Sequence, residues 1–106
     1  MFVVMNRIPV QPEFRETFED RLRARAHEID RMPGFVRTWL LRPVDPEDPY
    51  VVMTVWTSEE AFEAWRQSEA FQRGHARSGA LPREAFRGPS KVERYQVVLR
   101  SEEDGP

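Results

Sequence analysis

Apolar and polar residues alternate along the first strand-like segment of the chain. Within residues 2–9, one face carries Phe2, Val4, Asn6 and Ile8, and the other carries Val3, Met5 and Arg7. Both faces are largely apolar, which predicts a β-strand that is covered on both sides.

The period changes after Pro12. Apolar residues then recur at spacings of three and four, at Phe14, Phe18, Leu22, Ala26 and Ile29. This spacing predicts an amphipathic helix of about five turns, with its charged residues on the solvent face. Pro12 suits the first turn of a helix, and Pro33-Gly34 is a helix-ending pair.

The middle of the chain has the pattern of a hairpin followed by a helix. Segments 35–42 and 50–57 are predicted strands, and they flank the acidic, proline-rich link 43–49. Thr57 and Glu60 have the spacing of a capping box, so a helix that carries Phe62 and Trp65 is expected to begin there.

The last third of the chain is predicted in four pieces. Ser68 is expected to cap a short helix that places Phe71 and His75 one turn apart. Residues 78–90 are rich in Gly, Pro and Ser and predict a loop, residues 91–100 alternate as a last strand, and residues 101–106 predict a flexible tail.

The order of these elements, β-α-β-β-α-(α)-β, predicts an α+β ferredoxin-like fold with an antiparallel sheet. The 106 residues fit one domain, which we place at residues 1–100. Helices cover only one face of such a sheet, and the other face would expose apolar residues such as Val3 and Met5. A large apolar sheet face is rarely left in water, so we expect a homodimer of the α+β barrel type.

Composition excludes several classes of function. A formal net charge of −2 is unlike a nucleic-acid-binding surface, which needs excess positive charge. The chain has no cysteine, which fits a cytoplasmic location and excludes thiolate metal sites. The amino terminus is too short and polar for a signal peptide or a membrane span. No phosphate-binding glycine motif is present, so neither a flavin nor a nicotinamide site is predicted.

The stretch from Trp56 to His75 contains most of the candidate chemistry. It reads W-x-S-x-x-x-F-x-x-W-x-x-S-x-x-F-x-x-x-H, and it accompanies Asn6-Arg7 on the first strand and Pro33-Gly34-Phe35 before the second. This set resembles the antibiotic biosynthesis monooxygenase superfamily, and within it the Isd-type heme-degrading monooxygenases. The resemblance extends over nearly the whole chain.

The resemblance implies a pocket lined by Asn6, Trp65 and His75. His75 would be the axial ligand of heme iron, Asn6 would form a hydrogen bond on the opposite side of the ring, and Trp65 would press on the porphyrin. Phe71, which lies one turn before His75, would also contact the heme. Heme would serve as cofactor and substrate, O2 would be inserted into the ring, and an external reductase would supply electrons.

Residue chemistry alone leaves simpler interpretations open. His75 can be a surface histidine, Trp65 can be a core residue, and the Asn6 side chain can bond to a neighbouring backbone group. A buried amide on an apolar strand nevertheless needs a hydrogen-bond partner. Two other functions therefore stay open. One is a cofactor-free monooxygenase of a quinol or polyphenol with His75 as base, and the other is a non-catalytic dimeric binding module.

Overall fold

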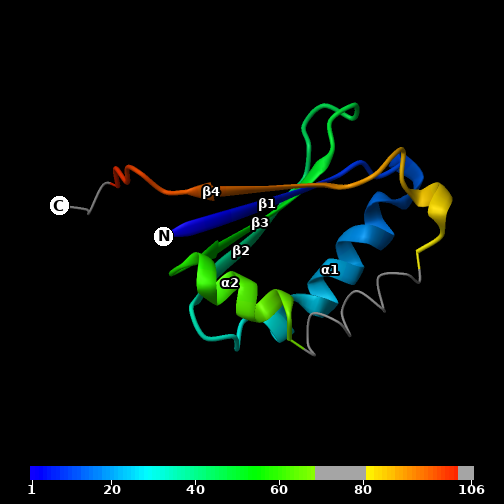
Figure 1. Cartoon of the computed structure of the whole chain (residues 1–106). Helices are drawn as coiled ribbons and strands as arrows, with labels where there is room; N and C mark the ends of the chain where they lie inside the picture. Colours follow the sequence, from blue (N-terminus) through cyan, green and yellow to red (C-terminus); the bar gives the residue numbers. More distant parts are fainter. Residues whose placement is uncertain (69–80, 103–106) are drawn as a thin grey trace.

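The computed structural model describes residues 1–68 and 81–102, which form a four-stranded antiparallel sheet with helices on one face (Figure 1). The elements in chain order are β1 (Phe2–Ile8), the 3-10 turn η1 (Pro12–Phe14), α1 (Arg15–Ile29), β2 (Phe35–Leu41), β3 (Tyr50–Trp56), α2 (Glu59–Arg66), the 3-10 turn η2 (Arg83–Ala85) and β4 (Lys91–Gln96). The predicted antiparallel α+β architecture is confirmed. Neither helix in the described part of the chain is long and apolar enough to cross a membrane.

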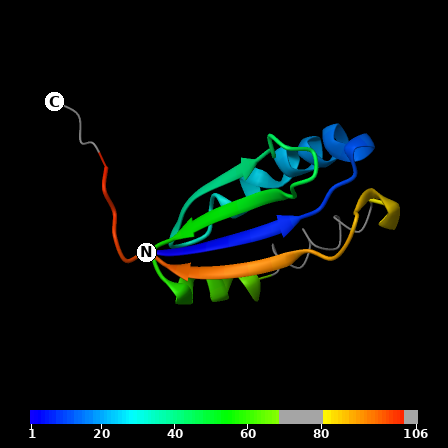
Figure 2. The ribbon, with the colours of Figure 1, turned by 90° about the horizontal axis from the view of Figure 1, so that it is seen from above.

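The strand order is β2-β3-β1-β4, so the amino-terminal strand lies in the centre of the sheet. In the register of β1 and β3, Phe2 lies opposite Trp56 and Asn6 lies opposite Val52. Seen from above, α1 lies behind β2 and β3, and α2 lies beneath β4 (Figure 2). The two helices therefore share one face of the sheet and lie towards its opposite edges, and both pack against β3.

Two apolar clusters join the helices to the sheet. The first consists of buried Phe2, Val4, Ile29, Trp56 and Phe62, and it fastens α2 and the end of α1 to β1 and β3. The second consists of buried Val10, Phe18 and Tyr50, and it fastens the start of α1 to the opposite end of β3. The sheet is thus held to its helices at both ends of the strands.

Several element boundaries differ from those predicted. The expected single helix after Pro12 begins as η1 and becomes α-helical only at Arg15, and α1 ends at Ile29. The last strand ends at Gln96, which pairs with Phe2 at the start of β1. The predicted loop 78–90 contains η2, and Phe86 forms an isolated β-bridge with Val10.

The predicted capping box at Thr57 is wrong by one residue. Ser58 is the N-cap of α2, and its Oγ accepts a hydrogen bond from the backbone N–H of Ala61 at 3.2 Å. The backbone N–H of Thr57 instead donates to the carbonyl of Gly34 at 2.8 Å. Gly34 has a φ of +82°, and a Cβ there would lie 2.4 Å from the Cβ of Ala61, so this junction requires glycine.

The charged residues of α1 were predicted to face solvent, but Glu19 is buried, with 7% of its surface exposed. Its carboxylate accepts two hydrogen bonds from Arg42 at 2.7 Å, one from the Tyr50 hydroxyl at 2.5 Å and one from Arg23 at 3.2 Å. The bonds from Arg42 and Tyr50 hold the pKa of Glu19 at about 2, well below its ordinary value. This cluster ties α1 to both strands of the β2–β3 hairpin.

We expect Glu19→Gln to lower the free energy of unfolding by about 2 kcal/mol at neutral pH, because charged hydrogen bonds to Arg42 and Tyr50 are lost. Since folding lowers the pKa of Glu19 from 4.5 to about 2, the carboxylate contributes this stability above pH 4.5 and loses it as the pH falls towards 2. Urea unfolding at several pH values measures the difference between the two proteins.

Glu16→Gln is the matched control, because it removes the same charge from an exposed position on the same helix. Its effect should stay within about 0.5 kcal/mol. A Glu19→Gln effect of that small size, or one that does not diminish in acid, would contradict the role assigned to the cluster.

Candidate functional site

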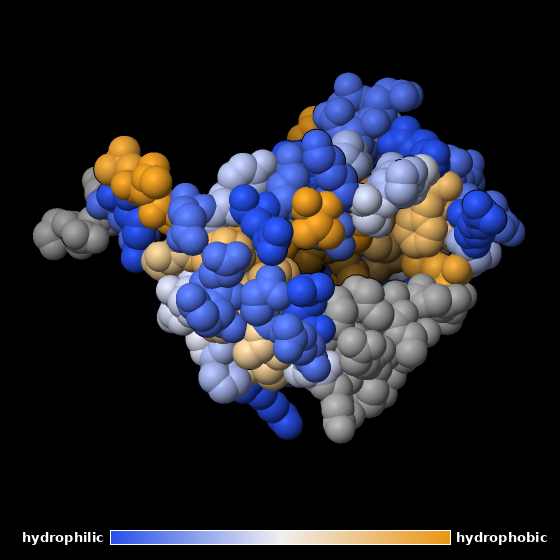
Figure 3. All heavy atoms as spheres, viewed as in Figure 1, coloured by the Kyte–Doolittle hydropathy of each residue, from blue (hydrophilic) through white to orange (hydrophobic). Residues whose placement is uncertain are grey.

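A cavity of about 700 Å³ lies between α1 and the sheet, beside the end of α2. This volume is in the range of small-molecule and cofactor pockets. Its walls come from α1 (Leu22, Arg23, Arg25, Ala26, Glu28, Ile29 and Asp30), β2 (Phe35, Val36, Arg37, Thr38 and Leu40), β3 (Val52 and Thr54) and α2 (Trp65). The surface is hollowed between the sheet and the helices, with apolar residues inside the hollow (Figure 3).

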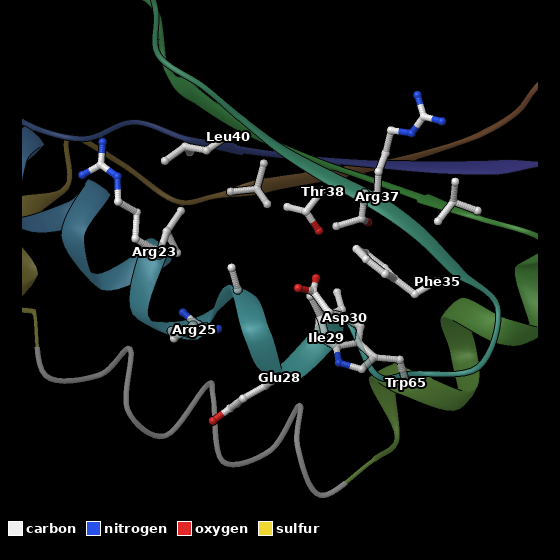
Figure 4. A pocket seen from close by; sticks show the side chains of 15 residues that line it. Arg23, Arg25, Glu28, Ile29, Asp30, Phe35, Arg37, Thr38, Leu40 and Trp65 are labelled. Carbon is white, nitrogen blue, oxygen red and sulfur yellow. The ribbon is translucent and has the colours of Figure 1, made fainter.

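The sheet side of the cavity is built by alternation along β2 and β3. Thr38 lies opposite Thr54 and Leu40 lies opposite Val52, and all four side chains are on the helix-facing side. A β-bulge between Phe35 and Arg37 places Phe35 on this side too, where its ring lies 5.5 Å from that of Trp56. Figure 4 shows Thr38 and Phe35 facing Ile29 and Trp65 across the cavity.

Trp65, one of the predicted pocket residues, forms one end of the cavity. Its position follows from the helical spacing that brings it beside Phe62 on α2, with ring centroids 6.3 Å apart. Its ring also lies 5.7 Å from that of buried Trp56. After α2, the Ser68 hydroxyl donates to the Trp65 carbonyl at 2.6 Å. Trp65 is therefore a partly buried aromatic wall that packs against Trp56 and Phe62.

Asn6 lies on the helix-facing side of β1, between Val52 of β3 and Val92 of β4. Its Oδ1 is buried and has no hydrogen-bond partner among the described residues. Asn6 is outside the wall of the cavity, but its neighbour Val52 is part of that wall. A buried amide oxygen without a partner is rare in folded proteins, and it identifies Asn6 as a group that a ligand or water can satisfy.

The other two predicted heme contacts, Phe71 and His75, lie outside the described residues, as do the short helix expected to follow Ser68 and residues 103–106 of the predicted tail. The structure therefore places Asn6 and Trp65 on the same side of the sheet and leaves the position of His75 a prediction. His27, the other histidine, has 87% of its side chain exposed. Within residues 1–68 and 81–102, no three acidic or histidine side chains are grouped to hold a metal ion.

Sequence reasoning did not find the charged residues around the cavity. Arg23, Arg25, Glu28 and Asp30 of α1 are on its walls. The Arg37 side chain of β2 points away from the cavity (Figure 4), with its guanidinium 5.6 Å from the centre of the Trp39 ring. The Arg23 side chain is 64% exposed, and its guanidinium is 3.0 Å from Asp20 and 3.2 Å from Glu19. The spacing of Leu22, Ala26 and Ile29 in the apolar stripe of the helix was the available signal, because Arg23 and Arg25 flank that stripe.

Comparison with known proteins identifies the family and several relatives of the chain. Residues 1–77 match the sequence profile of the family described as antibiotic biosynthesis monooxygenase. The chain is 40% identical over 97 residues to the heme oxygenase (mycobilin-producing) of Mycobacterium tuberculosis strain H37Rv, covering 92% of this chain and 89% of that protein.

Solved structures agree with this match. The heme-degrader MhuD from Mycobacterium tuberculosis, with two hemes bound in its active site, superposes with a TM-score of 0.77 at 34% identity, over 96% of this chain and all of that one. A mutant of SnoaB, a cofactor-independent oxygenase from Streptomyces nogalater, superposes with a TM-score of 0.76 at 28% identity, over 96% of this chain and 97% of that one.

Proposed function

Because the chain belongs to the antibiotic biosynthesis monooxygenase family, we propose that it is a heme-degrading monooxygenase that opens the porphyrin ring with O2 and an external reductant. The observation that carries this proposal is the cavity between α1 and the sheet, which Trp65 closes at one end. The chain that forms this cavity is also 40% identical to a heme oxygenase. Heme is both cofactor and substrate in this proposal.

The described residues fit a porphyrin. The cavity of about 700 Å³ has apolar walls from Leu22, Leu40 and Val52, which suit a flat hydrophobic ring. The guanidinium groups of Arg23 and Arg25 supply positive charge for the carboxylates of heme. The unpartnered Oδ1 of Asn6 adds a polar group on the sheet side.

Each predicted residue has one task in this proposal. His75 would hold the iron through a neutral imidazole nitrogen, and Phe71 would pack against the ring. Trp65, which packs against Trp56, would press on the ring from the end of α2. Asn6 offers its side-chain amide on the sheet side. When bound, heme supplies the iron that activates O2 and the ring carbon that is oxidised.

A second candidate function is a cofactor-free monooxygenase of a quinol or polyphenol. The structural likeness to SnoaB favours it, because that oxygenase needs no cofactor and has the same fold. His75 would then act as a general base on the phenolic proton. A non-catalytic binding module is a third candidate, and absence of both activities would favour it.

We also propose a homodimer that forms through the sheet face without helices. On this face Trp39, Leu41 and Tyr95 are 51%, 41% and 46% exposed. Trp39 lies opposite Met53, which lies opposite Met5, so an apolar row crosses three strands. In the segment after β4, Val98 and Leu99 are 95% and 80% exposed. A second copy would remove these surfaces from water. An external reductase and a cytoplasmic location complete the proposal.

Hemin titration tests the proposed function. The unmodified protein should develop a Soret band that saturates, and a reductant in air should bleach it. His75→Ala should still take up some heme by burial of the ring, but with a shifted or broadened Soret band and no reductant-driven bleaching, because the iron ligand is gone. The control is His27→Ala, at an exposed position, which should give the same Soret band and the same bleaching as the unmodified protein. Absence of a Soret band in the unmodified protein would remove the heme proposal and make the quinol assay the next step.

Asn6→Ala separates binding from turnover. The iron ligand is retained, so the Soret band should persist, whereas the rate of reductant-driven bleaching should fall because the amide on the sheet side is lost. Stopped-flow absorbance under air measures both quantities on the same sample. Equal bleaching rates for the two proteins would show that Asn6 has no part in the reaction.

The dimer is tested by sedimentation velocity at micromolar concentration. The unmodified protein should sediment at twice the 12.5 kDa mass of one chain. Trp39→Glu should shift the population towards the monomer, because a charge would be buried in the apolar face. Val44→Glu, in the β2–β3 link, is the control, since Val44 is already fully exposed. A stable monomer of the unmodified protein would contradict the proposal.

A further inference from the structure

Two threonines that lie opposite each other on the sheet side of the cavity differ in their hydrogen bonding. Thr38 of β2 and Thr54 of β3 are register partners, and both line the cavity. The Thr54 Oγ1 accepts a hydrogen bond from Nε1 of buried Trp56 at 3.0 Å. The Thr38 Oγ1 is buried as well, but it has no hydrogen-bond partner within the described residues. The fold accounts for one hydroxyl and not for the other.

A buried hydroxyl without a partner destabilises the folded chain, because it loses its hydrogen bonds to water and gains none in return. Valine has nearly the same shape and a high preference for strands, so folding alone would favour valine over threonine at position 38. Residues that reduce the stability of a fold in this way are typical of functional sites. Thr38 has this character at the wall of the cavity between α1 and the sheet.

We propose that Thr38 is a ligand-binding residue whose hydroxyl donates a hydrogen bond to an oxygen atom of the molecule held in the cavity. Rotation about the Cα–Cβ bond exchanges the hydroxyl and methyl positions between staggered rotamers, so the hydroxyl can turn towards a bound ligand. With the Oδ1 of Asn6, it gives the helix-facing side of the sheet two polar groups that have no hydrogen-bond partner among the described residues. This inference rests on the proposed function for the identity of the ligand, heme.

The test compares stability with affinity in Thr38→Val. The urea midpoint of the ligand-free protein should stay the same or rise, because an unpaired hydroxyl is removed. The dissociation constant for hemin should increase about threefold to tenfold, the range expected for one hydrogen bond. Thr38→Ser retains the hydroxyl and should restore most of the affinity. Thr17→Val, at an exposed site of α1, should change neither quantity.

Thr54→Val provides the contrasting stability measurement. The same substitution one strand away leaves the indole N–H of Trp56 without an acceptor, so its urea midpoint should fall. Opposite signs for the two valine variants are the expected result. A lower midpoint for Thr38→Val would show that its hydroxyl supports the fold, and that result would overturn the inference.

Titration with metal-free protoporphyrin IX identifies the ligand oxygen that accepts the hydrogen bond from Thr38. If Thr38→Val weakens both hemin and protoporphyrin IX, the acceptor is a carboxylate at the edge of the ring. If only hemin is weakened, the acceptor is on the iron side. Equal affinity of Thr38→Val and the unmodified protein for hemin would overturn the inference and leave the proposed function intact. Failure of the unmodified protein to bind either porphyrin would reject the proposed function itself.

Discussion

The packing of Trp56 determines how the rest of the molecule is arranged. Its side chain is fully buried at the end of β3, and its ring lies 5.9 Å from Phe62 and 5.7 Å from Trp65. Because both partners belong to α2, the contact fixes this helix against the sheet. The Gly34 junction supports the same contact, since no side chain fits between it and Ala61. Trp65 is thereby held at the end of the cavity.

The cavity lies between the two apolar clusters, which fasten the helices at opposite ends of the strands. The Trp56 cluster holds α2 and the end of α1, and the second cluster around Tyr50, with the buried Glu19, holds the start of α1. Between these anchors the sheet presents Thr38 and other residues of β2 and β3 to an open space. The stable contacts are thus at the two ends, and the buried oxygens of Asn6 and Thr38, which have no hydrogen-bond partner among the described residues, lie between them. This division is the expected pattern for a fold that carries a binding site.

Residue patterns predicted the elements and the aromatic end of the cavity, because period and motif carry that information. They did not predict the details that depend on contacts between distant segments. The bulge that turns Phe35 towards the helices and the burial of Glu19 beside Arg42 and Tyr50 arise only when the hairpin meets α1. The same holds for the Thr38 hydroxyl, because its lack of a hydrogen-bond partner among the described residues depends on every group that surrounds it. Ser58 caps α2 where Thr57 was expected, and Thr57 lies one residue earlier, where its backbone N–H donates to the carbonyl of Gly34.

The most direct test of heme degradation is the fate of oxygen. The hemin-loaded protein is supplied with ascorbate under 18O2, with catalase present to remove peroxide, and the pigments are analysed by mass spectrometry. The proposed function predicts an open-chain tetrapyrrole that contains 18O from O2, and its formation should be lost in His75→Ala. Recovery of intact heme, or of ring-opened pigment without label, would contradict the assignment of this protein as a heme-degrading monooxygenase.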